Sequence, residues 1–371
     1  MKFTAIQASL HEALKKIKYI VIKIGTNTIK SHIENNNYAF FDDLSRISEN
    51  LMKQNIHPII VSSGAVGLGK NLMKEKLQSS FKKFSLVEKQ ALASLGQSLL
   101  IDIYREAFGK NQIPVSQILV SKEDFQNKKH YQNLKRTLDQ LLKWNSVPVI
   151  NENDAVATDE LKVGDNDTLS ELITGMYPNT LLIMMTSIDG FYMNSKKVSV
   201  LSKVSSKELN YAEGPNEGGI GGMKTKLKSA SKILLSGQIM NICSGEDAGI
   251  LEKILSAEEC GTWFFNALSK NSLSAKKRWL LHNRHNSGII HIDKGAKDAL
   301  HKNTASLLIV GIKNFEGHFE KGDIVSIYYN QKRIGKGITS FAGSELAMLI
   351  AEKDKKKGVE FIHRDNLIIL D

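Results

Sequence analysis

The 371-residue sequence predicts an α/β protein with a mainly parallel sheet, followed by a small, mainly β domain. In the long N-terminal part, short apolar runs alternate with stretches of helical periodicity. This is the pattern of βαβ units whose sheet is covered on both faces. After about residue 268, strand-like runs follow one another with turn residues between them and little helical signal.

Five apolar runs of the N-terminal part are predicted strands, at residues 19–24, 57–61, 115–120, 147–150 and 181–185. The spacing of apolar residues predicts helices over 42–54, 87–108, 134–144 and 168–176. At the start of the last helix, Thr168 and Glu171 have the spacing of a capping box. Ligands of such sheets bind outside the carboxyl ends of the strands, and a site is expected there.

The C-terminal part has predicted strands at residues 288–292, 306–310, 323–329 and 367–370. The polar stretch 269–277 before them has the composition of a linker. We therefore expect an α/β domain over 1–268, a linker over 269–284 and a β domain over 285–371.

Composition limits the class of protein. The net charge of +11 could attract nucleic acid, anionic lipid or phosphorylated substrates, but the lysines are spread along the chain with one local run, 352–357, which favours an ordinary solvated surface. Cys243 and Cys260 have no CxxC spacing, which argues against a zinc site or a disulfide framework and suits a reducing compartment. No apolar run could span a bilayer and no signal peptide is recognisable, so we expect a cytoplasmic protein without membrane contact.

Two glycine-containing turns follow the first two predicted strands. Lys23, near the end of strand 19–24, is costly to bury unless it meets an anion, and Gly25 lets the backbone approach that anion. The segment 62–69 is rich in small residues, which free N–H groups for an anion at a helix start. Neither turn requires a ligand. Lys23 could extend its ammonium group to solvent, and the small residues of 62–69 could serve close packing of a helix on a strand. Considered alone, the first turn does not decide between binding and structure, and the second favours packing.

The densest polar group follows strand 147–150. It comprises seven acid or amide side chains, at 151–154 and 165–167. Such residues favour turns and helix caps, but a cap needs one of them and not seven. This group favours a polar ligand site.

A glycine-rich segment, 218–222, precedes a helix that contains Leu227 and Ala230. Such a loop can bind an anion at the helix start. Lys226, in the first turn, opposes the helix dipole and argues against a mere surface loop. Together the four motifs predict phosphoryl transfer without a P-loop, because lysines and glycine N–H groups can neutralise the charge of a phosphoryl group.

These residues resemble the amino acid kinase family over nearly the whole chain. The resemblance is carried by VIKIGTNTI (21–29), VSSGAVGLG (61–69), NENDAVATDELKVGDNDTLSELI (151–173), SIDGFY (187–192) and GGMKTKLKSA (221–230). The third segment is the most specific, since members that act on acetylglutamate, aspartate, carbamate or UMP do not share it.

The resemblance implies an open αβα sandwich and ATP-dependent phosphorylation of the side-chain carboxylate of L-glutamate. The product would be L-glutamyl 5-phosphate, an intermediate toward proline, so proline is an expected feedback inhibitor. Mg²⁺ is the expected cofactor beside ATP, held mainly by phosphate oxygens, and no residue is assigned to it. A homo-oligomer is also expected.

By position, Lys23 and Lys226 would contact the transferred phosphoryl group and Asp167 would hold both lysines. The glutamate-binding positions match Ser63, Asp154 and Asn166. The nucleotide-binding positions match Lys23, Gly25, Thr186, Ser187, Ile220, Gly221, Gly222, Met223, Lys224, Thr225 and Lys226. The family usually has Asp where Ser187 stands and often Thr where Ile220 stands, which puts details of nucleotide contact in doubt.

The run 287–327 resembles a PUA domain, a small pseudo-barrel seen in RNA-modifying proteins. A basic surface could bind RNA through phosphates, but aromatic residues for base stacking are sparse. We therefore favour a structural or regulatory role over RNA binding. Two alternatives stay open: another amino acid kinase such as an aspartokinase, and an RNA-binding protein on an inactive kinase scaffold.

Overall fold

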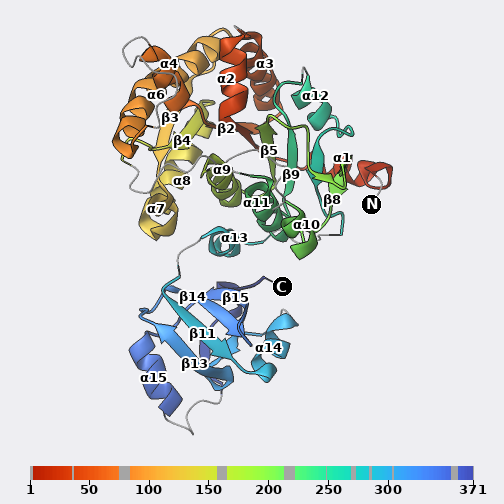
Figure 1. The fold of residues 1–371 in the computed structure, drawn as a ribbon. Helices are drawn as coiled ribbons and strands as arrows, with labels where there is room; N and C mark the ends of the chain where they lie inside the picture. Colours follow the sequence, from red (N-terminus) through yellow and green to blue (C-terminus); the bar gives the residue numbers. More distant parts are fainter. Residues whose placement is uncertain are drawn as a thin grey trace. The chain divides into compact units, whose positions relative to one another are not determined.

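The structure is a computed structural model of the chain. It describes residues 3–35, 37–74, 84–156, 165–212, 222–247, 249–268, 273–283, 286–302, 305–351 and 358–370. The chain divides into two compact units, Met1–Ser272 and Leu273–Asp371. Each unit has its own sheet and its own hydrophobic core (Figure 1).

Unit 1 is built on an eight-stranded sheet with the order β3-β4-β2-β1-β5-β9-β10-β8. The strands from β3 to β9 pair in parallel, and β10 pairs antiparallel to β9. The predicted mainly parallel sheet is confirmed. The bounds are β1 (Tyr19–Ile24), β2 (His57–Ser62), β3 (Val115–Val120), β4 (Val147–Glu152), β5 (Thr180–Thr186), β8 (Val200–Leu201), β9 (Ile239–Ser244) and β10 (Thr262–Phe264). Strands β6 (Tyr192–Met193) and β7 (Lys196–Lys197) form a separate hairpin.

Helices cover both faces of this sheet, as Figure 1 shows. On one face lie α1 (Gln7–Leu14), α2 (Thr26–Glu34), α3 (Ala39–Lys53), α4 (Ala65–Leu72), α6 (Leu86–Gly109) and α12 (Ile250–Leu255). On the other lie α7 (Lys122–Gln126), α8 (Lys128–Lys143), α9 (Asp165–Met176), α10 (Ser206–Tyr211) and α11 (Met223–Leu235). Side chains alternate along a strand, so Ile20, Ile22 and Ile24 of β1 enter the first core and Val21 enters the second.

Unit 1 has elements that the sequence did not predict, and three differences are informative. Strand β9 was not predicted, because Asn241 interrupts its apolar run; the Asn241 amide donates to the Cys260 carbonyl at 3.0 Å. Helix α8 begins six residues earlier than predicted, after Asn127, whose side chain caps it. The predicted capping box at Thr168 is wrong, since α9 begins at Asp165 and Glu171 accepts hydrogen bonds from α11 instead.

Unit 2 is β-rich, as predicted, but its described residues also form helices. Its main sheet has the order β13-β11-β14-β15-β17, and a second pair joins β12 and β16. The strands are β11 (Gly288–Ile292), β12 (Leu307–Leu308), β13 (Ile312–Gly317), β14 (Ile324–Tyr329), β15 (Lys332–Ile338), β16 (Glu360–Ile362) and β17 (Leu367–Ile369). The helices are α13 (Ala275–His282), α14 (Lys294–His301) and α15 (Gly343–Ala351). The predicted strand 306–310 is cut short, because a 3-10 turn begins at Ile309.

Helix α13 lies in the segment that we predicted to be a linker. Its Leu280 and Leu281 are buried against Ile324 and Ile368 of the unit 2 sheet. The helix therefore belongs to the second unit, and the change between units comes earlier than its polar sequence suggests. Within the described ranges, no helix is both long enough and apolar enough to cross a membrane.

Candidate active site

The carboxyl ends of three neighbouring strands meet at one edge of the unit 1 sheet. Ile24, the last residue of β1, lies opposite Ser62 of β2 and Met185 of β5. Because these strands are parallel, the turns that follow them lie side by side. The Ser63 N–H donates to the Ile24 carbonyl at 3.1 Å, and the Gly25 N–H donates to the Met185 carbonyl at 3.3 Å.

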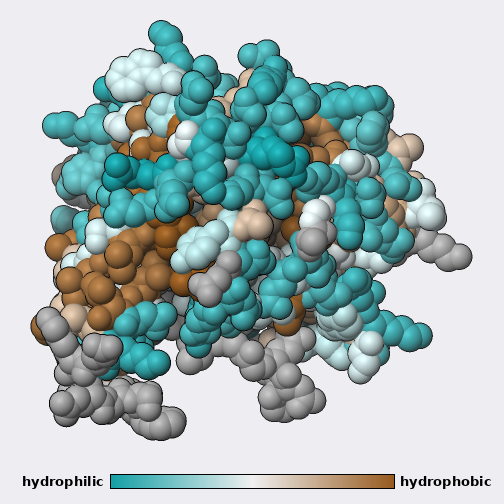
Figure 2. Space-filling model, turned by 90° about the horizontal axis from the view of Figure 1, so that it is seen from above, coloured by the Kyte–Doolittle hydropathy of each residue, from teal (hydrophilic) through white to brown (hydrophobic). Residues whose placement is uncertain are grey.

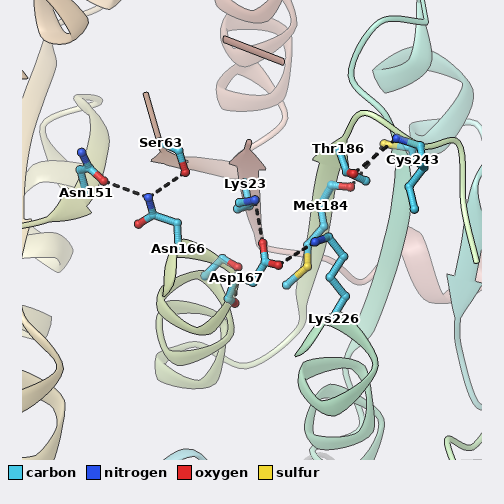
Figure 3. A network of polar contacts seen from close by, with 11 residues as sticks. Lys23, Ser63, Asn151, Asn166, Asp167, Met184, Thr186, Lys226 and Cys243 are labelled. Carbon is cyan, nitrogen blue, oxygen red and sulfur yellow. Dashed lines mark hydrogen bonds and ion pairs between the residues drawn. The ribbon is translucent and has the colours of Figure 1, made fainter. Parts of the chain in front are cut away.

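Lys23, Asp167 and Lys226 form a buried ionic triad at this edge (Figure 3). Lys23 lies two residues after Val21 and so points to the same face of β1, the face that α9 and α11 cover. Asp167 is in the first turn of α9 and Lys226 in the first turn of α11. The Lys23 Nζ lies 2.7 Å from Asp167 Oδ1, and the Lys226 Nζ lies 2.8 Å from Oδ2. The structure thus brings together the three residues predicted to be catalytic.

The ionised state of the triad gives it a net positive charge, which suits it to bind an anion. Burial alone would raise the pKa of Asp167, but the two ammonium groups hold that pKa below its ordinary value. Burial lowers the pKa of Lys23, and Asp167 opposes that effect. One carboxylate between two ammonium groups leaves a formal charge of +1. Because both carboxylate oxygens are engaged, Asp167 is suited to positioning the lysines and not to accepting a proton.

A chain of amide and hydroxyl groups lies on one side of the triad. The Asn166 Nδ2 donates to Ser63 Oγ at 2.8 Å and to Asn151 Oδ1 at 3.0 Å. The Asn151 Nδ2 donates in turn to Gln97 Oε1 at 2.8 Å. The Asn166 Oδ1 is buried, with no hydrogen-bond partner in the part of the chain that the structure describes. Asp154 is half-buried in the turn after β4. This arrangement offers both acceptors and donors to a polar molecule.

Three of the described helices start at this edge without a side-chain cap. They are α2, after Gly25, α4, after Gly64, and α11, after Gly222. Their first N–H groups can bind an anion. Gly64 has φ 107°, a left-handed conformation that favours glycine.

The packing explanation of segment 62–69 holds for Gly69, with a different partner from the one we expected. A Cβ on Gly69 would lie 1.9 Å from the Leu92 carbonyl oxygen, and a Cβ on Gly96 would lie 1.8 Å from that of Ala65. Gly69 therefore serves the contact between α4 and α6, and not contact with a strand.

The residues matched to nucleotide binding lie on the other side of the triad. In Figure 3, Thr186 and Lys226 lie across Lys23 from Asn166. Thr186 ends β5, and its hydroxyl accepts from the Ile188 N–H at 3.4 Å, while Ser187 is exposed. The remaining matched residues of the described chain are in or beside the first turn of α11: Gly222, Met223, Lys224 and Thr225. Ile220 and Gly221 lie outside the described residues.

No group of three or more His, Cys, Asp or Glu side chains that could hold a metal ion occurs in the described part of the chain. Cys243 and Cys260 are free and buried, and burial raises the pKa of both thiols. They are therefore poor nucleophiles.

Gln97 is the member of this site that the sequence analysis missed. It follows Leu92, Ala93 and Gly96 on the buried face of α6 and is 8% exposed. The available signal was its spacing, since a polar residue in line with the apolar face of a helix needs a partner.

Comparison with known proteins agrees with this geometry. The amino acid kinase family matches residues 18–243, and the PUA domain matches residues 288–363. Glutamate 5-kinase from Caldanaerobacter subterraneus subsp. tengcongensis is 37% identical, over 95% of this chain and 98% of its own. Glutamate 5-kinase from Geobacter metallireducens is 36% identical, over 96% and 99%. The chain therefore belongs to the glutamate 5-kinases of the amino acid kinase family and carries a C-terminal PUA domain.

Proposed function

We propose that this chain transfers the γ-phosphoryl group of ATP to the side-chain carboxylate of L-glutamate, the first step of proline biosynthesis. The observation that carries the proposal is the buried Lys23–Asp167–Lys226 triad. It lies between a polar group suited to an amino acid and a helix start suited to phosphates. Membership of the glutamate 5-kinases supports the same assignment.

The reaction joins a carboxylate oxygen of glutamate to the γ-phosphorus and breaks the bond from that phosphorus to the β–γ bridging oxygen. The products are L-glutamyl 5-phosphate and ADP. Free glutamate side chains are ionised at neutral pH, since their ordinary pKa is about 4.3. No general base is needed, which fits a carboxylate whose oxygens are both occupied by lysines. Lys23 and Lys226 would stabilise the charge on the phosphoryl oxygens during transfer.

The amide and hydroxyl groups would bind the glutamate. Asp154 and the Asn166 Oδ1 can accept hydrogen bonds from the substrate ammonium group. The Ser63 Oγ accepts from Asn166 and keeps its own hydrogen for a substrate carboxylate. Such a site favours a zwitterionic amino acid.

The nucleotide would lie on the side of Gly25, Thr186 and Ser187, with its phosphates at the start of α11. Its remaining contacts would come from Ile220 and Gly221, which lie outside the described residues, and from the first turn of the helix. Mg²⁺ bound to the nucleotide would supply further neutralisation of phosphate charge. The engaged oxygens of Asp167 fit a metal ion held chiefly by phosphates.

Substrate-dependent ADP release tests the proposal. L-Glutamate should give turnover, while L-aspartate and N-acetyl-L-glutamate should give little. Preferred turnover of aspartate would favour the aspartokinase alternative. Filter binding with bulk RNA, in the absence of any ADP release, would favour an RNA-binding protein on an inactive scaffold.

We also propose that the chain forms homo-oligomers through the side of unit 1 where α4 and α6 lie. Figure 2 shows apolar residues gathered on this side. Val87 and Leu95 of α6 are 72% and 40% exposed, and Leu119 of β3 is 39% exposed. Strand β3 is at the edge of the sheet, so its free edge could pair with a second copy. Light scattering should give a multiple of the chain mass, and Leu95→Glu should lower it.

A further inference from the structure

Gln97 has a buried donor that the fold itself does not use. Its Oε1 accepts from the Asn151 Nδ2 at 2.8 Å, while its Nε2 has no hydrogen-bond partner among the described residues. The side chain is 8% exposed. Leaving a buried donor unpaired opposes folding, so a role in stability alone accounts poorly for a glutamine at this position.

The direction of the hydrogen bonds around Gln97 is set by the backbone. The Glu152 N–H donates to the Asn151 Oδ1 at 2.9 Å, and a backbone N–H can only donate. The amino group of Asn151 must therefore face Gln97, which must present its oxygen. The Asn151 Oδ1 also accepts from Asn166, so the Asn151 side chain is held from both ends.

The state of Asn166 follows from this. Its amino group uses both hydrogens, one toward Ser63 and one toward Asn151, and its Oδ1 is left as a buried acceptor. If Asn151 could rotate, the Asn166 amide could turn and present its amino group instead. That group would repel a substrate ammonium group, whereas the oxygen attracts it.

We infer that Gln97 is a positioning residue for substrate selection. By holding Asn151, it keeps the Asn166 oxygen turned toward the ammonium group of the amino-acid substrate. The inference rests on the proposed function and deepens it, because it assigns the preference for a free α-ammonium group to a side chain on α6. Gln97 acts through Asn151 and Asn166, without touching the reacting atoms.

The test compares L-glutamate with glutarate, which lacks only the ammonium group. Gln97→Met removes the acceptor for Asn151. It should raise KM for L-glutamate about tenfold to a hundredfold, the effect of one hydrogen bond to a charged group. The kcat and the KM for ATP should change little, and the preference for glutamate over glutarate should fall by a similar factor. Gln97→Glu keeps an oxygen for Asn151 and should retain more of that preference.

Gln238→Met is the matched control. Gln238 is also a buried glutamine, 4% exposed, and its amide donates to the Thr174 and Tyr177 carbonyls at 2.9 and 2.6 Å. It directly precedes β9, at the amino ends of the parallel strands, whereas the site lies at their carboxyl ends. Its replacement should lower the melting temperature without changing the preference for glutamate.

An unchanged preference in Gln97→Met, with a melting temperature lowered as in Gln238→Met, would overturn the inference. So would an equal loss of preference in Gln97→Glu and Gln97→Met. If Gln97→Met does not fold, Gln97→Asn provides the same test, because it stays polar but is too short to reach Asn151. The unmodified chain separates the two proposals: without glutamate-dependent ADP release the proposed function fails, whereas with release and unchanged variants only the role of Gln97 fails.

Discussion

Replacing Asp167 with asparagine removes the negative charge of the ionic triad and keeps the size of the side chain. The carboxylate is 1% exposed, and its two oxygens lie 2.7 and 2.8 Å from the ammonium nitrogens of Lys23 and Lys226. An amide has one acceptor oxygen, and its amino group would face the second ammonium group. One lysine therefore loses its partner, while the formal charge of the triad rises from +1 to +2.

Breaking a buried ion pair by removing one partner costs about 3–5 kcal/mol, so the variant should unfold at lower temperature or urea concentration. One lysine would also lose its position for the transition state, which typically lowers kcat by about 10²–10³. Both effects are measurable at pH 7, by thermal unfolding and by ADP release at saturating substrates. More positive charge would thus give less catalysis, because position matters more than charge.

Glu171→Gln is the control. Glu171 is also 1% exposed, and it pairs with Lys232 at 2.8 Å, one turn farther along α9. Its replacement should destabilise the fold without a comparable loss of kcat. A kcat of Asp167→Asn within about threefold of the unmodified chain would refute the assignment of the triad to the reaction.

The stability difference between the unmodified chain and Asp167→Asn should depend on pH. The pKa of Asp167 is lowered in the folded state, so its stabilising effect is fully present above the ordinary aspartate pKa of about 3.9. It should disappear as the pH falls through the lowered folded-state pKa. Urea unfolding of both proteins across this pH range measures the difference in their free energy of unfolding. A difference that persists in strong acid would contradict the conclusion that it comes from the ionised carboxylate.

Four further outcomes are expected. Asp154→Ala should raise KM for glutamate and leave ATP affinity nearly unchanged, since it removes an acceptor for the ammonium group; equal weakening of both substrates in initial-rate assays would place Asp154 elsewhere. Excess EDTA should abolish ADP release, because Mg²⁺ neutralises the nucleotide phosphates, and full turnover would exclude this requirement. Proline should raise the apparent KM for glutamate, as a competing α-amino acid; rates unaffected at millimolar proline would argue against feedback. A chain ending at residue 268 should melt cooperatively and retain ADP release, because Leu280 and Trp279 pack within unit 2; a folded but inactive fragment would show that unit 2 completes the enzyme.

Much of unit 1 could be predicted from local sequence. Five of its strands are mainly apolar runs, and apolar spacing located most of the long helices. Alternation along β1 even places Lys23 on the face opposite Ile22 and Ile24. Local sequence does not tell that α9 and α11 cover that face, because this depends on the order of the strands in the sheet.

The polar residues that were missed form hydrogen bonds with partners far away in the sequence. Asn241 interrupts the apolar pattern of β9, and its buried amide is accommodated because it donates to the Cys260 carbonyl, shortly before β10. In the sequence, Gln97 resembles an ordinary polar residue of a helix, and only the fold shows that Asn151 lies beside it. Helix α13 has a polar sequence, and only the sheet of unit 2 shows why its two leucines are buried.

Gly96 makes one practical difference for anyone altering this enzyme. A Cβ there would lie 1.8 Å from the Ala65 carbonyl oxygen and 2.4 Å from the Gly69 nitrogen, so any larger residue pushes α6 away from α4. The next residue on α6 is Gln97, and it would move away from Asn151 with the helix. A genetic screen for loss of growth without proline should then yield substitutions at Gly96. These variants should bind substrate weakly, although Gly96 has no side chain that could contact it. Libraries intended to broaden amino-acid scope should therefore keep positions 69 and 96 constant and vary 97, 151 and 166.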